Sequence, residues 1–177
     1  MRLSGKALDR NRVCSLLGAC CLFLSVVEYM IPKPVPFMRI GLANLPLMLA
    51  LDIFPFGSFL VLVCIKVLGQ ALITGTLFSY IFLFSIAGTF SSAMVMYALR
   101  RIFGKDRLTF IGIGTAGAMV SNIAQLGLSR VFIFGENTRF LAPPFLFMGL
   151  FTGIMLGLFC EVFSRKSQWY ANMAEKK

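Results

Sequence analysis

The chain has 177 residues, of which 58% are hydrophobic and only 14% are charged. Because a soluble domain usually carries about 25% charged residues, this chain is too apolar to cover a water-facing surface. The net charge of +10 does not indicate a nucleic-acid partner, since the basic residues lie between apolar runs, where they set membrane topology instead. We expect an all-α integral membrane protein.

Six apolar runs follow one another along the chain, and we predict a bundle of about six transmembrane helices, since a span needs about 20 apolar residues. The predicted helices cover residues 13–31, 40–54, 58–78, 79–99, 108–129 and 142–163. The second run is short, and hardly any loop separates the third from the fourth. Pro32, Pro34 and Pro36 end the first helix, because three prolines in five residues forbid a helix.

The distribution of Lys and Arg predicts the orientation of this bundle. With a cytoplasmic N-terminus, most of the 17 basic residues fall in cytoplasmic segments, as the positive-inside rule requires. We therefore expect both termini in the cytoplasm (N-in/C-in) and a multi-pass protein of the inner (cytoplasmic) membrane of a bacterium. A basic tail would cover 1–12, one transmembrane domain 13–163, and a polar, fraying tail 164–177.

Ionisable and amide side chains occur inside these apolar runs, where they are costly and therefore indicate function. The helical rise of about 1.5 Å per residue places most of them in the outer half of the bilayer. The predicted substrate-binding residues are Glu28, Arg39, Asn44, Lys66, Gln70, Ser121, Asn122 and Gln125. Because these side chains are expected to lie in one layer, they predict a small-molecule site open to the outside. Two alternatives to a ligand site remain: hydrogen bonds between polar side chains that hold the helices together, or a purely structural pair of Glu28 and Lys66.

Gly149, Gly153 and Gly157 recur at four-residue spacing on the last predicted helix. This spacing aligns them on one face, where another helix can approach closely. They predict either packing within the chain or a docking face for a membrane partner. Asp52, near the inner end of the second run, is interpreted as an interface residue rather than a ligand-binding one.

The sequence shows no pattern typical of an enzyme. The chain has no histidine, and its five cysteines lie in apolar stretches without metal-ligand spacing, so we expect neither a metal nor a cofactor. No nucleophile–base arrangement is visible, and we therefore predict no catalytic residues. A Gly-rich phosphate-binding loop is also missing, so an ATP-driven activity would need a partner chain.

From Glu28 to Asn44 the sequence reads EYMIPKPVPFMRIGLAN. This string resembles the signature of the Gx transporter family, which is also labelled heptaprenyl diphosphate synthase component I. Weaker matches, which extend the resemblance over about 13–163, are Phe56-Gly57, Ser85-x-x-Gly88 and Gly117-Ala118 … Asn122-x-x-Gln125. The sequence departs from the family pattern at Phe37 (glycine expected), Lys66 (arginine expected) and Ser121 (histidine expected).

The family is similar to the substrate-binding S components of energy-coupling-factor importers. Those six-helix proteins capture a vitamin-like substrate from outside, while a coupling membrane subunit and two ATPases supply the energy. The resemblance implies a lid loop with Pro32, Pro34 and Pro36. It also implies that Glu28, Asn44, Asn122 and Gln125 line the pocket.

Three functions remain open from the sequence. The first is a substrate-capture subunit of a small-molecule importer. The second is a membrane-bound accessory subunit of heptaprenyl diphosphate synthase, which would bind a soluble synthase at 100–107 or at the tail. The third is a self-contained secondary transporter, with Glu28 and Lys66 as its coupling pair. The sequence does not identify the substrate.

Overall fold

The computed structural model describes residues 2–31 and 40–175, except for the side chains of 2–10, 105, 106, 174 and 175. Every regular element in this part of the chain is a helix, which confirms the predicted all-α class. The helices are α1 (Arg2–Met30), α2 (Leu45–Ile53), α3 (Phe56–Ile73), α4 (Tyr80–Arg107), α5 (Phe110–Ser129), α6 (Thr138–Lys166) and α7 (Gln168–Glu175). A 3-10 turn η1 (Leu42–Asn44) precedes α2, while a π turn η2 (Arg130–Phe134) and a 3-10 turn η3 (Gly135–Asn137) link α5 to α6.

Four helical stretches among the described residues are long and apolar enough to cross a membrane. They are Asn11–Met30, Phe56–Ile73, Tyr80–Gly104 and Phe110–Lys166, and the last of these, 57 residues long, contains both α5 and α6. Stretches of this length and hydropathy indicate a multi-pass membrane protein in a lipid bilayer.

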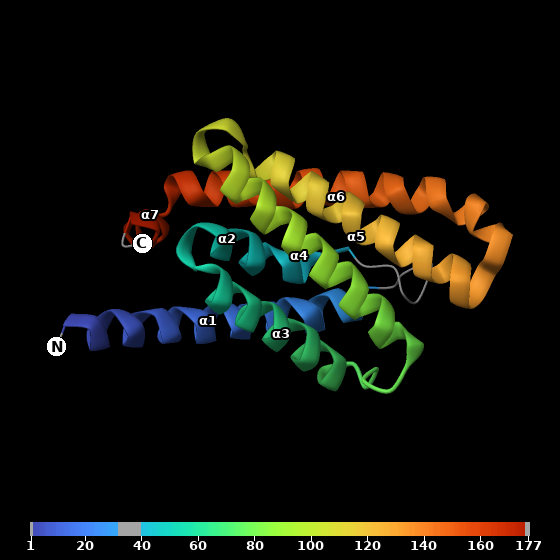
Figure 1. Ribbon diagram of the computed structural model, residues 1–177, viewed down its shortest axis with the longest axis horizontal. Coiled ribbons are helices and arrows are strands. Elements are labelled where there is room, and N and C mark those ends of the chain that lie inside the picture. Colours follow the sequence, from blue (N-terminus) through green and yellow to red (C-terminus); the bar gives the residue numbers. More distant parts are fainter. Residues whose placement is uncertain (1, 32–39, 176–177) are drawn as a thin grey trace.

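The helices form an elongated bundle in which successive helices alternate in direction (Figure 1). One end, which we call the terminal end, holds both chain termini, the α2–α3 turn and the α4–α5 turn (Figure 1). The opposite end holds the α3–α4 and α5–α6 connections. The first and last described residues therefore lie at the same end of the bundle (Figure 1). Which side is cytoplasmic remains a prediction.

The short helix α2 lies inside the bundle. Its residues from Pro46 to Ile53 are all buried, and it contacts α1, α3, α4, α5, α6 and α7. A helix that is apolar on every side is stable only when other elements surround it. Its nine residues rise about 13 Å, less than half of a bilayer core. The predicted second span is therefore a short core helix.

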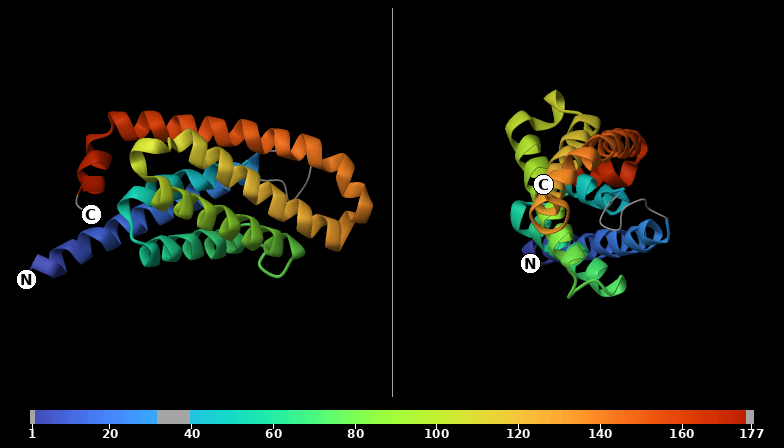
Figure 2. Two further views of the ribbon diagram at one scale, coloured as in Figure 1. Left: turned by 45° about the horizontal axis from the view of Figure 1, so that its top comes forward. Right: turned by 90° about the vertical axis from the view of Figure 1, so that its right-hand side faces the viewer.

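Several boundaries differ from the sequence prediction, since α1 begins at Arg2 rather than at residue 13, α4 continues to Arg107 rather than 99, and α6 begins at Thr138 rather than 142. The third predicted helix was expected to reach residue 78, but α3 ends at Ile73, because the chain turns at Gly75, whose φ is +65°. The expectation that the chain frays after residue 163 is also wrong for 164–175. There α6 continues to Lys166 and α7 follows, turning back at the terminal end (Figure 2).

The glycine face of α6, formed by Gly149, Gly153 and Gly157, packs against α5 within the same chain. A Cβ added at Gly157 would lie 2.5 Å from Ile111 Cα, and one at Gly153 would lie 2.9 Å from Thr115 Cα. The two helices run side by side over most of their length (Figure 2). Close packing within the bundle thus uses the glycine spacing.

Candidate functional site

A polar cavity lies at the N-terminal end of α2, between α1, α3, α4, α5 and α6. Its volume is about 30 Å³, which is room for very few water molecules. Sites for small organic molecules usually measure about 300–1,000 Å³. The structure therefore shows a small pocket, and a metabolite would need the pocket to widen.

Six of the predicted substrate-binding residues line this cavity: Glu28, Asn44, Lys66, Gln70, Ser121 and Asn122. Gln125 lies behind them, with its side chain buried and its Nε2 donating a hydrogen bond to Ser121 Oγ at 3.0 Å. Arg39 and the predicted lid prolines Pro32, Pro34 and Pro36 lie outside the described residues. The cavity thus gathers side chains from runs that are far apart in the sequence.

Glu28 on α1 binds the backbone that leads into α2. The amide of Ile40 donates to Glu28 Oε1 at 3.0 Å, and the amide of Ala43 approaches Oε2 at 3.5 Å. Amides at the start of a helix have no partner within the helix and favour a negative charge. Since Glu28 is only 2% exposed, its carboxylate fixes residues 40–44, which we call the entry segment of α2.

Lys66 on α3 holds the same entry segment from the other side. Its Nζ donates a hydrogen bond to Asn44 Oδ1, and its side chain is buried. The segment itself is tightly turned, because Gly41 has a φ of +88° and its carbonyl accepts the amide of Asn44 at 2.8 Å. The two charged residues of the described lining therefore both contact the entry segment.

Hydroxyl groups from α4, α5 and α6 also line the cavity, and most of them were not predicted from the sequence. Thr89 and Ser92 on α4 and Thr152 on α6 join the predicted Ser121 on α5. Ser85, Thr89 and Ser92 are spaced by four and three residues, which places them on one face of α4. That spacing was the available signal, and it is weak, because hydroxyl side chains are common in membrane helices.

Asn122 both lines the cavity and links two helices. Its Nδ2 donates to the backbone carbonyl of Phe145 on α6 at 2.8 Å. Gly149 lies beside this contact, and a Cβ added there would overlap the Asn122 amide. The amide thus forms the interhelical hydrogen bond typical of membrane bundles.

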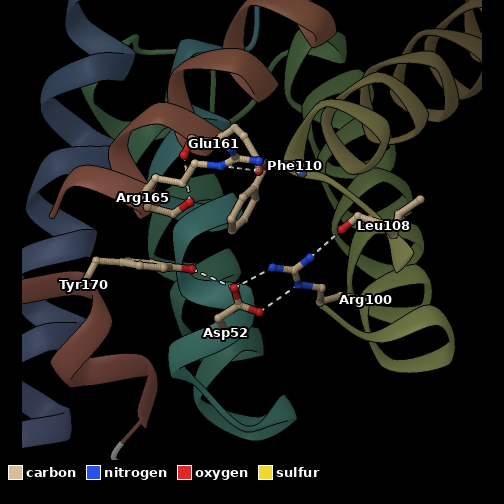
Figure 3. A network of polar contacts seen from close by, with 8 residues as sticks. Asp52, Arg100, Leu108, Phe110, Glu161, Arg165 and Tyr170 are labelled. Carbon is tan, nitrogen blue, oxygen red and sulfur yellow. Dashed lines mark hydrogen bonds and ion pairs between the residues drawn. The ribbon is translucent and has the colours of Figure 1, made fainter. Parts of the chain in front are cut away.

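Asp52 occupies the other end of α2, at the terminal end of the bundle (Figure 3). Its carboxylate accepts Arg100 Nε at 2.8 Å and the terminal guanidinium nitrogen of Arg100 at 2.7 Å, and it is only 3% exposed. Arg100 also donates to the Leu108 carbonyl at 2.7 Å. The helices thus bury Asp52 in an ion pair, and its interpretation as an interface residue stays a prediction.

Tyr170 of α7 completes this network from the far end of the sequence (Figure 3). Its hydroxyl donates to Asp52 Oδ2 at 2.8 Å, and its ring is buried against Phe110 and Phe163. Burial, and then the adjacent Asp52 carboxylate, raise the pKa of Tyr170. Asp52, Arg100 and Tyr170 therefore tie α2, α4 and α7 together, and we call them the Asp52 network.

A second carboxylate lies near this network. Glu161 on α6 accepts the amide of Phe110, the first residue of α5, at 3.0 Å. An anion at this position complements the positive end of the α5 dipole. Its other oxygen accepts Arg165 at 3.0 Å. In the described part of the chain, no group of three or more Cys, Asp or Glu side chains is placed to hold a metal ion.

Comparison with known proteins identifies one family. The family model described as heptaprenyl diphosphate synthase component I matches residues 17–163, which is most of the chain. Searches of curated proteins and of solved structures gave no match. The resemblance seen in the sequence is thereby confirmed at the level of the family.

Proposed function

The chain belongs to the heptaprenyl diphosphate synthase component I family, and from this premise we propose that it is the substrate-capture subunit of a small-molecule importer. It binds a metabolite in the cavity at the N-terminal end of α2. A coupling membrane subunit with ATPases then supplies the energy for release into the cell. The protein itself catalyses no reaction.

The observation that carries this proposal is the convergence of buried polar groups on one cavity. Glu28 and Lys66 are 2% and 3% exposed, and both belong to helices that are long and apolar enough to span a membrane. Ionisable side chains at such depth are expensive and usually face a functional cavity. A pocket with a few convergent polar groups is the expected form of a ligand site.

The orientation that we propose opens this cavity to the outside. Exposed basic side chains at the terminal end are Arg101, Arg107, Arg165 and Lys166, and the positive-inside rule favours the cytoplasm for such an end. The cavity lies at the opposite end of α2 from the Asp52 network. Substrate would therefore enter from the side that bears the α3–α4 and α5–α6 connections.

Native mass spectrometry of the purified full-length protein, incubated with a bacterial metabolite extract, tests this function. We expect a retained small molecule on the wild type and its loss in Ala118→Leu, which fills the cavity lining. Ala124→Leu on the same helix lies outside the described lining and should retain the molecule. The capture role would be refuted if both variants retained the molecule. It would also be refuted if neither the wild type nor either variant retained one.

Uptake measurements separate a capture subunit from a secondary transporter. The wild-type protein alone in liposomes should bind the retained molecule but should not accumulate it under a proton gradient. Accumulation by the lone protein would favour a secondary transporter. The Glu28–Lys66 coupling pair of that hypothesis has a competing structural use, since both side chains hold the entry segment of α2.

The family name supports a second candidate, an accessory subunit that binds a soluble prenyl diphosphate synthase. The exposed residues Arg101 and Arg107 at the end of α4 offer a basic surface for it. Arg100 is unsuited to this contact, because its guanidinium binds Asp52. Prenyltransferase activity that copurifies with the wild type but not with Arg101→Glu, and is retained by Arg139→Glu, would favour this candidate.

A further inference from the structure

The cavity has two sides of different chemistry. On the side of α1 and α3, Glu28 accepts the Ile40 amide and Lys66 donates to Asn44. These are the charged members of the lining that the structure describes, and they have opposite signs. Both charges contact the entry segment, and because they offset each other, the described residues of this side provide no net charge to attract an ion.

The side formed by α4 and α5 presents neutral hydroxyl groups. Ser92 is 1% exposed and lines the cavity, and its Oγ has no hydrogen-bond partner among the described residues. Ser121 Oγ accepts a hydrogen bond from Gln125 Nε2, so its own hydroxyl hydrogen is available to donate elsewhere. Thr89 lines the cavity one turn before Ser92 and is 4% exposed.

An unpaired hydroxyl in a buried site is costly, and native proteins rarely leave one without a reason. The polar groups of a ligand pocket are such a reason, because they receive their partners from the ligand. A hydroxyl can both donate and accept a hydrogen bond. Ser92 and Ser121 are thus suited to the hydroxyl or amide groups of an uncharged molecule.

We propose that Ser92, with Thr89 and Ser121, forms the wall that recognises the ligand, and that this ligand is an uncharged molecule bearing hydroxyl or amide groups. Glu28 and Lys66 are positioning residues that hold the entry segment. This inference rests on the proposed function in taking the cavity as the ligand site. A charged ligand would lose its hydration here without gaining a net counter-charge from the described lining residues.

Thiol labelling tests the inference without knowledge of the natural ligand. Full-length Ser92→Cys and Thr89→Cys are treated with three methanethiosulfonate reagents of similar size, which carry a neutral hydroxyethyl, an anionic sulfonatoethyl or a cationic trimethylammonioethyl group. Mass spectrometry of peptides reports the rate at each introduced thiol, divided by the rate for free mercaptoethanol. We expect the neutral reagent to react at least about tenfold faster than either charged one.

Ser25→Cys is the matched control. Ser25 is also fully buried, but its Oγ binds the Cys21 carbonyl at 2.7 Å and it lies outside the described lining, so its thiol should stay unmodified. Equal or faster reaction of the charged reagents at Ser92→Cys and Thr89→Cys would overturn the neutral-ligand inference and leave the proposed function standing. No reaction at either position in folded protein would refute both.

Discussion

The hydroxyl of Tyr170 donates a hydrogen bond to Asp52 Oδ2 at 2.8 Å, although the two residues lie 118 positions apart in the sequence. This contact places α7 against the C-terminal end of α2. The N-terminal end of the same helix borders the cavity, where Glu28 and Lys66 hold it. A buried helix of nine residues therefore joins the Asp52 network to the cavity.

Loss of the Asp52 carboxylate should strongly destabilise the protein. Asp52→Leu leaves the Arg100 guanidinium in a largely buried position without its counter-charge, and removal of one partner of such a pair costs about 3–5 kcal/mol in the free energy of unfolding. Unfolding in detergent measures this loss. Glu136→Leu, which removes an exposed partner of Arg130 and Arg139, should cost about 0–1 kcal/mol. Equal losses in the two variants would contradict the buried ion pair.

Tyr170 should make stability depend on pH above about 10, the ordinary pKa of a tyrosine. Burial and the Asp52 carboxylate raise the pKa of Tyr170 in the folded protein. Its contribution to stability is therefore complete below pH 10 and is lost as the pH rises further, because only the unfolded tyrosine ionises there.

The comparison of Tyr170→Phe with wild type measures this dependence. Melting temperatures between pH 9 and about pH 11 should fall less steeply in the variant, since phenylalanine cannot ionise. An identical slope for Tyr170→Phe and wild type would show that Tyr170 ionises equally in both states.

The α5–α6 interface should tolerate no side chain at Gly157. A Cβ there meets Ile111 Cα at 2.5 Å and Phe110 O at 2.7 Å, and backbone atoms cannot move aside as a side chain can. Overpacking of this kind costs about 1–3 kcal/mol, so Gly157→Ala should lower the melting temperature.

Gly127→Ala is the matched control on α5. No atom of the described residues lies within 4 Å of an added Cβ at Gly127, so this substitution should be neutral or stabilise by about 0.4–1 kcal/mol. Similar destabilisation by both substitutions would mean that glycine at 157 is not required by the close approach of the helices.

Glu28 should stabilise the entry segment of α2 through hydrogen bonds to its backbone amides. Glu28→Ala removes the acceptor of the Ile40 and Ala43 amides, and a hydrogen bond to a charged group contributes about 1.5–3 kcal/mol. Hydrogen exchange at these two amides should therefore accelerate by about tenfold to a hundredfold. Mass spectrometry of the peptide that contains the segment measures the rate.

Glu161→Ala provides the control for local specificity. Glu161 holds the Phe110 amide in the same way, so this variant should accelerate exchange at Phe110 and leave residues 40–44 unchanged. If hydrogen exchange of the entry segment stayed at the wild-type rate in Glu28→Ala, the proposed positioning role of Glu28 would be refuted, whatever the effect of the substitution on ligand binding.

The sequence alone determined the helical class and most of the charged and amide members of the cavity. Both follow from local costs: an apolar run needs lipid or a core around it, and a residue such as Glu28 or Lys66 within that run is expensive wherever it lies. The tertiary structure decided which groups meet. Glu28 binds amides of the entry segment, Ser92 lines the cavity, and the Tyr170 hydroxyl donates a hydrogen bond to Asp52. These contacts depend on how distant helices pack, and a serine or tyrosine has no local cost that would reveal its partner beforehand.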